Sequence, residues 1–272
     1  MVDIGGTFTD VVLKHGDEIY TLKLLPQLET PENGIREGVS RVLDQASLTY
    51  EDIGLVIHGT TLATNALIER KGARTAMITT EGFRNTIEMG TESRFDQYDI
   101  FLDKPKPLVP RRWRYPVSQR HDAQGRETMP LDEDNVPSIF PKLQEENIES
   151  LAVCLLHAFV NPEHEQLIQA LIQDEFPKLQ ISLSSEVSPE MREYERFSTT
   201  AAIAFIQPVI SAYLERLRQG LHDDWYRAPM LMMLSGGGLT SVETAVNFPI
   251  RLVESGPAGG AILRRIWQKD WT

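Results

Sequence analysis

Apolar residues recur along the chain with two spacings, and these spacings predict an alternation of strands and helices. Short aliphatic or β-branched runs predict strands, and apolar positions three or four residues apart predict helices. At the first helix, Thr30, Pro31 and Glu32 supply an N-cap, a proline at the first helical position and an acid in the first turn. The predicted strands cover residues 11–13, 18–25, 55–57, 73–79, 150–157, 180–184, 230–234 and 250–253, and the predicted helices cover residues 30–46, 64–71, 83–89, 132–147, 162–176 and 190–221.

Strands separated by helices are typical of α/β layers. A tight turn joins the first two strands, so we expect a mixed sheet that is antiparallel at this opening hairpin. Breaks are expected in the last helix near residues 196–198 and at Pro208. Residues 91–130 are rich in Pro, Arg and Asp and have weak periodicity, which predicts an inserted subdomain or a lid. The alternative for this segment is a solvated connection.

Composition excludes some classes of function. The 272 residues carry a formal net charge of -12 without a basic stripe, so nucleic acid is not an expected partner. The longest apolar run, about ten residues, is shorter than the roughly 20 that a membrane span needs. No charged and then apolar leader precedes the first strand, and we therefore expect a cytoplasmic protein without a membrane partner. Cys154, the only cysteine, lies in an apolar run and is predicted to be buried.

The candidate chemistry begins at residues 3–10, Asp-Ile-Gly-Gly-Thr-Phe-Thr-Asp, which lead directly into a β-branched run. A strand after the glycines, and not a helix, excludes the Walker and dinucleotide fingerprints. In a strand–turn–strand loop, successive backbone amides can point at one anion. Gly5 and Gly6 permit positive φ angles and a close approach of the backbone to a ligand.

Four side chains around these glycines are candidate ligands as well. Thr7 and Thr9 offer hydroxyl donors to phosphate, and Asp3 is the better candidate for Mg²⁺ because it precedes the turn. Asp10 is expected to orient water or metal, or else to close the hairpin turn by hydrogen bonding. The alternative for the whole segment is a β-hairpin that binds no ligand.

Five motifs occur in order, and together they resemble the A-type subunit of the ATP-dependent hydantoinase/5-oxoprolinase family, which has acetone carboxylase subunits as relatives. The resemblance extends from residue 1 to about residue 261. The motifs are residues 3–10 (DIGGTFTD), 58–65 (HGTTLATN), 79–83 (TTEGF), 193–200 (EYERFSTT) and 255–260 (SGPAGG).

The resemblance implies an α/β fold: the first half of an actin-like (ribonuclease H-like) ATPase with a mixed sheet, an opening β-hairpin and an inserted subdomain. It assigns residues 1–185 to a hydantoinase/oxoprolinase N-terminal domain with an insert at about 91–130. Residues 186–272 would begin the hydantoinase A core domain. Family members hydrolyse a cyclic amide, such as 5-oxoproline or a hydantoin, at the expense of ATP, and phosphorylation of the ring amide oxygen is the usual proposal. The implied cofactors are ATP and Mg²⁺. The implied partner is a B-type subunit or a fused B-type region.

Two departures from the family pattern matter. Only Met1 and Val2 precede Asp3, so the first strand is shorter than in relatives. The second Asp-Gly-Gly-Thr phosphate loop, expected soon after residue 260, does not occur in these residues. We therefore expect the first half of a longer enzyme, as an expressed piece, a split gene product or a truncated reading frame. The alternatives are a subunit of an ATP-dependent ketone carboxylase and an inactive fragment.

A second candidate group, residues 58–61, ends one predicted strand and opens a helix. Ligands of open α/β sheets collect at such strand ends, and a helix N-terminus favours an anion. Thr60 and Thr61 are therefore candidate cofactor-binding residues. His58 is a candidate catalytic donor to the γ-phosphate or the lactam oxygen, or else a histidine that ties the turn together.

A metal site around residues 157–165 is not favoured by the sequence. His157, His164 and the acids Glu163 and Glu165 match no zinc spacing. Residues 161–163 fit a helix start instead.

Overall fold

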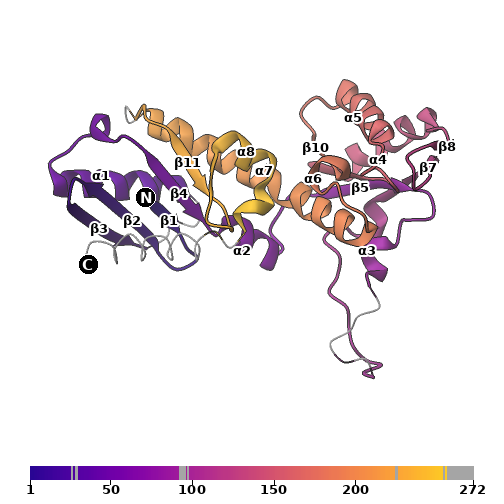
Figure 1. Cartoon of the computed structure of the whole chain (residues 1–272), viewed down its shortest axis with the longest axis horizontal. Helices are drawn as coiled ribbons and strands as arrows, with labels where there is room; N and C mark the ends of the chain where they lie inside the picture. The colour runs from indigo at the N-terminus through magenta and orange to yellow at the C-terminus, as the bar shows by residue number, and fades with distance from the viewer. Residues whose placement is uncertain are drawn as a thin grey trace. The chain divides into compact units, whose positions relative to one another are not determined.

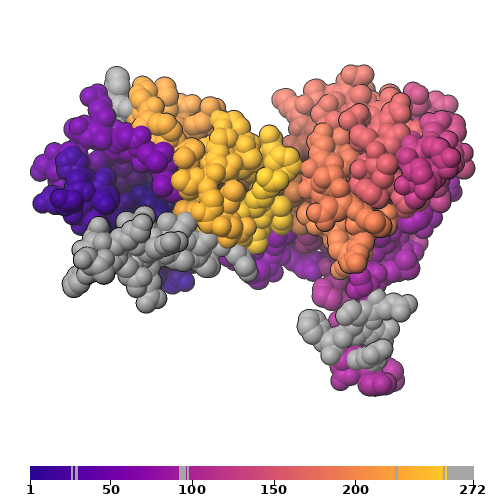
Figure 2. Space-filling view, viewed as in Figure 1, coloured from indigo at the N-terminus to yellow at the C-terminus, as the bar shows by residue number. Residues whose placement is uncertain are grey.

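The computed structural model describes residues 1–25, 27, 30–91, 96, 98–223, 226–253 and 255. The chain forms two compact units: unit 1 comprises Met1–Lys71 and Val209–Thr272, and unit 2 comprises Gly72–Pro208 (Figure 1). In Figure 2, indigo N-terminal atoms and orange-to-yellow C-terminal atoms lie side by side in unit 1, so both ends of the sequence build one body. The sequence-based division at residues 185–186 does not coincide with these units and stays a prediction.

Unit 1 is built on a six-stranded mixed sheet with the order β12-β11-β4-β1-β2-β3. The predicted opening hairpin is confirmed, because β1 pairs antiparallel with β2. On its other side β1 runs parallel to β4, which in turn runs parallel to β11. The elements of this unit are β1 (Val2–Ile4), β2 (Thr9–His15), β3 (Glu18–Leu24), α1 (Pro31–Ala46), η1 (Tyr50–Asp52), β4 (Val56–Thr60), α2 (Leu62–Ile68), β11 (Met230–Met233), β12 (Leu239–Ser241), α8 (Val242–Asn247) and η5 (Pro249–Leu252).

Helix α1 covers the hairpin end of this sheet, as its apolar spacing predicts. It begins at Pro31, and its apolar face, with Ile35 and Val39, is buried against β2 and β3. A Cβ atom at Gly38 would lie 2.6 Å from Val11 Cγ2, so only glycine allows the helix this close to the strand.

Unit 2 is built on a four-stranded parallel sheet with the order β10-β9-β5-β6, and β7 and β8 form a separate two-stranded ribbon. Its elements are β5 (Thr75–Thr80), α3 (Thr86–Met89), η2 (Arg111–Trp113), β6 (Arg114–Val117), β7 (Arg120–His121), β8 (Glu127–Met129), η3 (Glu133–Asn135), η4 (Pro137–Ile139), α4 (Phe140–Glu145), β9 (Ser150–Cys154), α5 (Glu163–Glu175), β10 (Gln180–Leu183) and α6 (Ser184–Val187). Helix α7 (Glu193–Asp223) contributes residues to both units.

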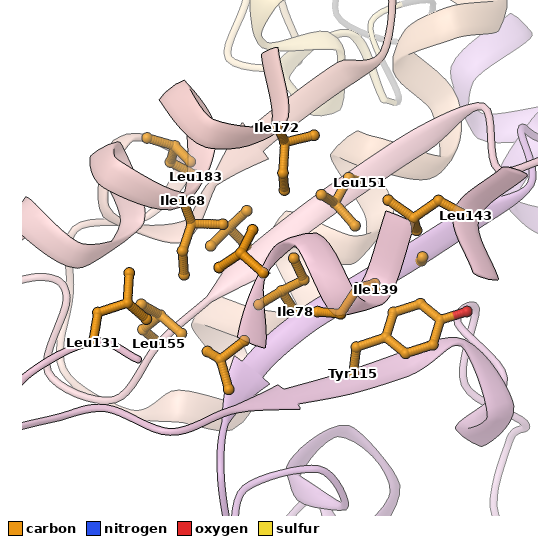
Figure 3. Close-up of a cluster of buried hydrophobic side chains, with 14 of the residues drawn as sticks. Ile78, Tyr115, Leu131, Ile139, Leu143, Leu151, Leu155, Ile168, Ile172 and Leu183 are labelled. Carbon is orange, nitrogen blue, oxygen red and sulfur yellow. The ribbon is translucent and has the colours of Figure 1, made fainter. Parts of the chain in front are cut away.

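The central strands of unit 2 are buried on both faces, as parallel strands usually are. Ile78 of β5 and Leu151 of β9 join a cluster with Ile168 of α5 on one face (Figure 3). Met77 and Cys154 pack into a second cluster on the other face. The prediction that Cys154 is buried is confirmed, and burial raises the pKa of its thiol well above the ordinary value.

Three sequence-based assignments of secondary structure were wrong, two because of a local proline and one because of packing. Residues 132–147 form η3, η4 and α4 and not one helix, because Pro137 and Pro141 each begin a new helical turn. Residues 250–253 are not a strand, because Pro249 begins the 3₁₀ turn η5. Neither predicted break in helix α7 occurs, since the helix continues through residues 196–198 and through Pro208. At Pro208, buried packing of flanking residues such as Ile206 offsets the missing hydrogen bond.

Residues 91–130 form an insert only in part. Arg114–Val117 is β6, a strand of the unit 2 sheet, and therefore not part of an insertion. The described residues between 96 and 107 do leave the body of unit 2 as a long loop (Figure 1). Its tip exposes Tyr98, Ile100 and Phe101, and its function as a lid stays a prediction.

Among the described residues, one helix is long and apolar enough to cross a membrane by length and composition, and that helix is α7. In its most apolar 18-residue window, 56% of the window is buried inside the protein. Core helices meet the same criteria, so this helix is weak evidence for a membrane span.

Candidate functional site

The glycine-rich loop lies at the edge of the unit 1 sheet where the parallel strands β1, β4 and β11 end. It comprises residues 5–8 and joins Ile4 of β1 to Thr9 of β2, which are paired. Ile4 also lies opposite Thr60, the last residue of β4. The carboxyl edge of parallel strands is where α/β sheets bind their ligands.

The backbone of this loop leaves amide groups available to a ligand. The Gly5 amide donates to the Phe8 carbonyl over 2.9 Å, which closes the turn. Gly6 and Thr7 are exposed, and within the described part of the chain their amides have no acceptor. Neither Gly5 nor Gly6 adopts the positive φ that glycine permits. What glycine provides at position 6 is space, because a Cβ atom there would meet only Asn65 Nδ2, at 3.6 Å.

The two threonines of the motif differ in position. Thr7 is exposed in the loop, so its hydroxyl is free to contact a ligand there. Thr9 is 2% exposed and belongs to β2, so its surroundings do not support contact with phosphate.

A row of three charged residues and one glycine crosses the same sheet beside the loop. Lys23, Asp10, Asp3 and Gly59 are successive cross-strand neighbours on β3, β2, β1 and β4. Residues directly opposite one another in neighbouring strands share one face of a sheet. Lys23 Nζ lies 2.6 Å from Asp10 Oδ1, so Asp10 forms an ion pair on the exposed side of the row.

One carboxylate oxygen of Asp3, Oδ1, is buried without a hydrogen-bond partner among the residues that the structure describes. The same oxygen packs against Gly59, and a Cβ atom added to Gly59 would lie only 2.7 Å from it. Burial, and then the charge of Asp10, raise the pKa of Asp3. A buried acceptor without a partner costs about 1–3 kcal/mol. A hard cation that prefers carboxylate oxygens, such as Mg²⁺, would relieve both the desolvation and the repulsion.

His58 lies one residue before Gly59 on β4, and its side chain is on the opposite face of the sheet. Its ring is fully buried, with Nδ1 3.2 Å from the Val2 carbonyl and Nε2 2.6 Å from the Tyr213 hydroxyl. Both ring nitrogens are therefore engaged within the protein. The surroundings favour the alternative in which His58 ties elements together, and they do not support its assignment as a catalytic donor.

The neutral ring of His58 predicts a loss of stability in acid. Burial lowers the pKa of His58 to about 4, although the hydrogen bond to Val2 opposes this. The unfolded chain takes up the proton near pH 6.5, so stability is fully present above that pH and is lost as the pH falls toward 4. We expect His58 to account for about 3 kcal/mol of unfolding free energy over this interval. Urea unfolding at a series of pH values measures it, and a His58→Gln variant with an unchanged pH dependence would contradict it.

Thr60 and Thr61 connect elements at the same edge. Thr60 is fully buried, and its Oγ1 accepts from the Leu62 amide at 3.1 Å. The amide and hydroxyl of Thr61 both donate to the Ile4 carbonyl, at 2.9 and 3.1 Å. Both threonines thus place the glycine loop beside the start of α2, and their contact with a cofactor stays a prediction.

A second glycine-rich loop lies at this edge, and the sequence left open whether it is a plain turn or contacts substrate. Residues 235–238 join β11 to β12, and β11 runs parallel to β4. Gly237 has a φ of +80°, and a Cβ atom at Gly236 would contact nothing within 4 Å. The Ser-Gly-Gly-Gly sequence of this loop is compatible with ligand binding, but a plain turn has the same composition.

Comparison with known proteins identifies the family. The hydantoinase/oxoprolinase N-terminal region matches residues 1–176, and the hydantoinase/oxoprolinase model matches residues 196–268. The chain belongs to the hydantoinase/oxoprolinase family. It is 32% identical over 266 residues to caprolactamase subunit alpha of Pseudomonas jessenii and 31% identical over 291 residues to 5-oxoprolinase 1 of Arabidopsis thaliana. These matches cover 94% and 96% of this chain but only 38% and 23% of the two relatives.

Solved structures confirm the predicted fold class. The crystal structure of ATP-dependent caprolactamase from Pseudomonas jessenii superposes with a TM-score of 0.86 at 31% identity, over 94% of this chain and 38% of that one. A nucleotide-free acetone carboxylase structure superposes with a TM-score of 0.87 over 99% of this chain and 40% of that one. At 22% identity the second match supports the fold alone.

Proposed function

We propose that this chain supplies the first phosphate-binding loop of an ATP-dependent hydrolase of cyclic amides. The observation that carries the proposal is the unpartnered, buried carboxylate oxygen of Asp3, directly beneath a loop with free amides. A site that binds the phosphates of ATP needs both parts, donors for the phosphate oxygens and a carboxylate for the accompanying cation. The family membership and the caprolactamase and 5-oxoprolinase relatives support ATP as the nucleotide and a ring amide as the substrate.

In this proposal each residue of the site has a separate task. The amides of Gly6 and Thr7 donate to phosphate oxygens, and the Thr7 hydroxyl adds a third donor. Asp3 holds Mg²⁺, which when bound would offset the negative charge of the phosphates. Lys23 neutralises the charge of Asp10, so the charge of Asp3 is the one in this row that a bound cation would balance.

The reaction proposed is phosphorylation of the ring amide oxygen. The γ-phosphoryl group would pass to that oxygen and ADP would leave, which makes the ring carbon open to attack by water. One water opens the ring at the carbon–nitrogen bond, and a second releases phosphate. Because the relatives are much longer than this chain, the remaining contacts are proposed to come from further family segments and from a B-type partner. A cytoplasmic location likewise stays a proposal.

An assay of the chain together with a B-type partner tests the function. Phosphate release from Mg²⁺·ATP would be followed with 5-oxoproline, hydantoin or caprolactam, and separately with acetone and bicarbonate. We expect one ring amide to stimulate release at least about ten-fold, with one ring opened per phosphate. Stimulation by the ketone and bicarbonate alone would indicate the carboxylase alternative.

Asp3→Asn tests the cation site without removing the side chain's volume. The variant removes the buried charge and its repulsion from Asp10, so the unfolding free energy should stay equal or rise by about 1 kcal/mol. Mg²⁺·ATP should bind at least about ten-fold more weakly, because one carboxylate ligand is lost. Asp17→Asn, in the exposed turn between β2 and β3, is the matched control. Calorimetric titration that gave equal affinities for the wild type and Asp3→Asn would exclude Asp3 from the site.

A further inference from the structure

Three potential metal ligands meet in unit 2, at a place that the proposed function does not use. His121 ends β7, Glu127 begins β8 directly opposite, and His164 is in the first turn of α5. One ligand atom from each lies within 4.8 Å of the other two. The two imidazoles are 2% and 3% exposed, whereas half of the Glu127 side chain is exposed.

A chain of hydrogen bonds fixes the orientation of the His164 ring. The Leu156 amide donates to Thr80 Oγ1 over 2.9 Å, and Gln119 Nε2 donates to the same hydroxyl. The other end of the Gln119 amide, Oε1, then accepts from His164 Nδ1 at 3.0 Å. In this arrangement Nδ1 carries the ring proton and Nε2 carries a lone pair.

That lone pair faces a second acceptor. His164 Nε2 lies 2.9 Å from Glu127 Oε2, and two acceptors at this distance need a proton or a cation between or beside them. The His164 ring also stacks on the His121 ring, with ring centroids 4.1 Å apart. A divalent metal ion would use one lone pair from each imidazole together with the carboxylate of Glu127.

We propose that unit 2 binds one divalent transition-metal ion of the zinc class through His121, Glu127 and His164. Gln119 is a positioning residue, because accepting the Nδ1 proton of a metal-binding histidine fixes the tautomer that binds. Two histidines and one glutamate form a known zinc donor set, and they leave a fourth position for water or a small anionic ligand.

Binding requires a small closing movement. Ligand atoms of a tetrahedral zinc site are about 3.3 Å apart, which follows from metal–ligand distances of about 2.0 Å. The three ligand atoms now lie up to 4.8 Å apart. Rotation of the exposed Glu127 side chain and of the His121 ring would bring them to the shorter separation. The ion would then join the β7–β8 ribbon to α5. The proposal is independent of nucleotide binding in unit 1.

Metal titration of the intact 272-residue chain tests the site. Chelator-treated protein would be titrated with Zn²⁺ against a chromophoric competitor and with Co²⁺ by visible absorption, with thermal unfolding as a third readout. We expect one Zn²⁺ per chain, a Co²⁺ spectrum of a four-coordinate nitrogen and oxygen site, and a higher melting temperature with metal.

Two variants separate a built site from surface binding. Glu127→Gln should weaken Zn²⁺ binding at least ten-fold and abolish the Co²⁺ spectrum. Glu133→Gln, an exposed acid nearby that removes the same charge, should change neither. No saturable uptake, or equal affinity in the wild type and Glu127→Gln, would overturn the proposal and leave a proton between His164 and Glu127. The Co²⁺ spectrum of the wild type decides the matter even if a variant fails to fold.

Discussion

Replacing Gly6 with valine should weaken Mg²⁺·ATP binding about 100-fold or more while the protein stays folded. The valine side chain would occupy the space above the loop that the phosphates need. The loss corresponds to two hydrogen bonds to a charged group, at about 1.5–3 kcal/mol each, and every 1.4 kcal/mol is about a factor of ten. Folding should tolerate the change, because φ at Gly6 is not positive and a Cβ atom meets its nearest neighbour at 3.6 Å.

The matched control for this experiment is Gly54→Val. Gly54 also lacks a positive φ, and a Cβ atom there would have no neighbour within 4 Å. It lies before β4, at the opposite end of that strand from the glycine loop. Calorimetry and thermal unfolding of both variants give affinity and stability together. If Gly6→Val bound nucleotide as tightly as Gly54→Val, the glycine loop would not be part of the site.

Replacing Glu165 with alanine should lower the unfolding free energy by about 3–5 kcal/mol. This carboxylate is completely buried in unit 2 and accepts four hydrogen bonds of 2.6–2.9 Å. Its donors are the Leu155 amide, the Ser184 hydroxyl, and the amide and hydroxyl of Ser185. Alanine would leave these donors buried without an acceptor. It would also remove one of the carboxylates near the buried Arg196, which donates to Ser184 Oγ and forms an ion pair with Glu193 at 3.5 Å.

Glu163→Ala is the control for the Glu165 experiment, because it removes a carboxylate from the same helical turn on the exposed side. It should cost no more than about 1 kcal/mol, the usual contribution of an acid at a helix N-terminus. Chemical denaturation of the two variants measures the difference. Equal losses of stability would show that the buried network around Glu165 contributes little.

Much of the fold could be predicted from local sequence, and where the prediction failed the cause was proline or packing. Helix α1 and the opening hairpin follow from periodicity and turn chemistry that act within a few residues. Pro137 helped to divide a predicted helix into two 3₁₀ turns and the short helix α4, and Pro249 changed a predicted strand into a 3₁₀ turn. Pro208 had the opposite outcome, because burial of its neighbours decides whether a helix tolerates it, and burial is set by residues distant in sequence.

The candidate site could be located from sequence, but the surroundings of its side chains could not be predicted. The glycine motif identified the loop and Asp3. The burial of His58 depends on Tyr213, which is 155 residues away, so no local pattern reveals it. The cluster around His164 was missed for the same reason: Glu127 and His121 come from a distant ribbon, and the spacing matches no metal motif.

The most direct test of the account is the response of individual backbone amides to Mg²⁺·ATP. Nuclear magnetic resonance of the ¹⁵N-labelled chain reports each amide separately and detects weak binding. We predict saturable shifts of the Gly6 and Thr7 amides that require Mg²⁺ and disappear in Asp3→Asn, with Gly54 unaffected. Nucleotide-induced shifts elsewhere, with the Gly6 and Thr7 amides unchanged at saturation, would contradict the claim that this loop binds the phosphates.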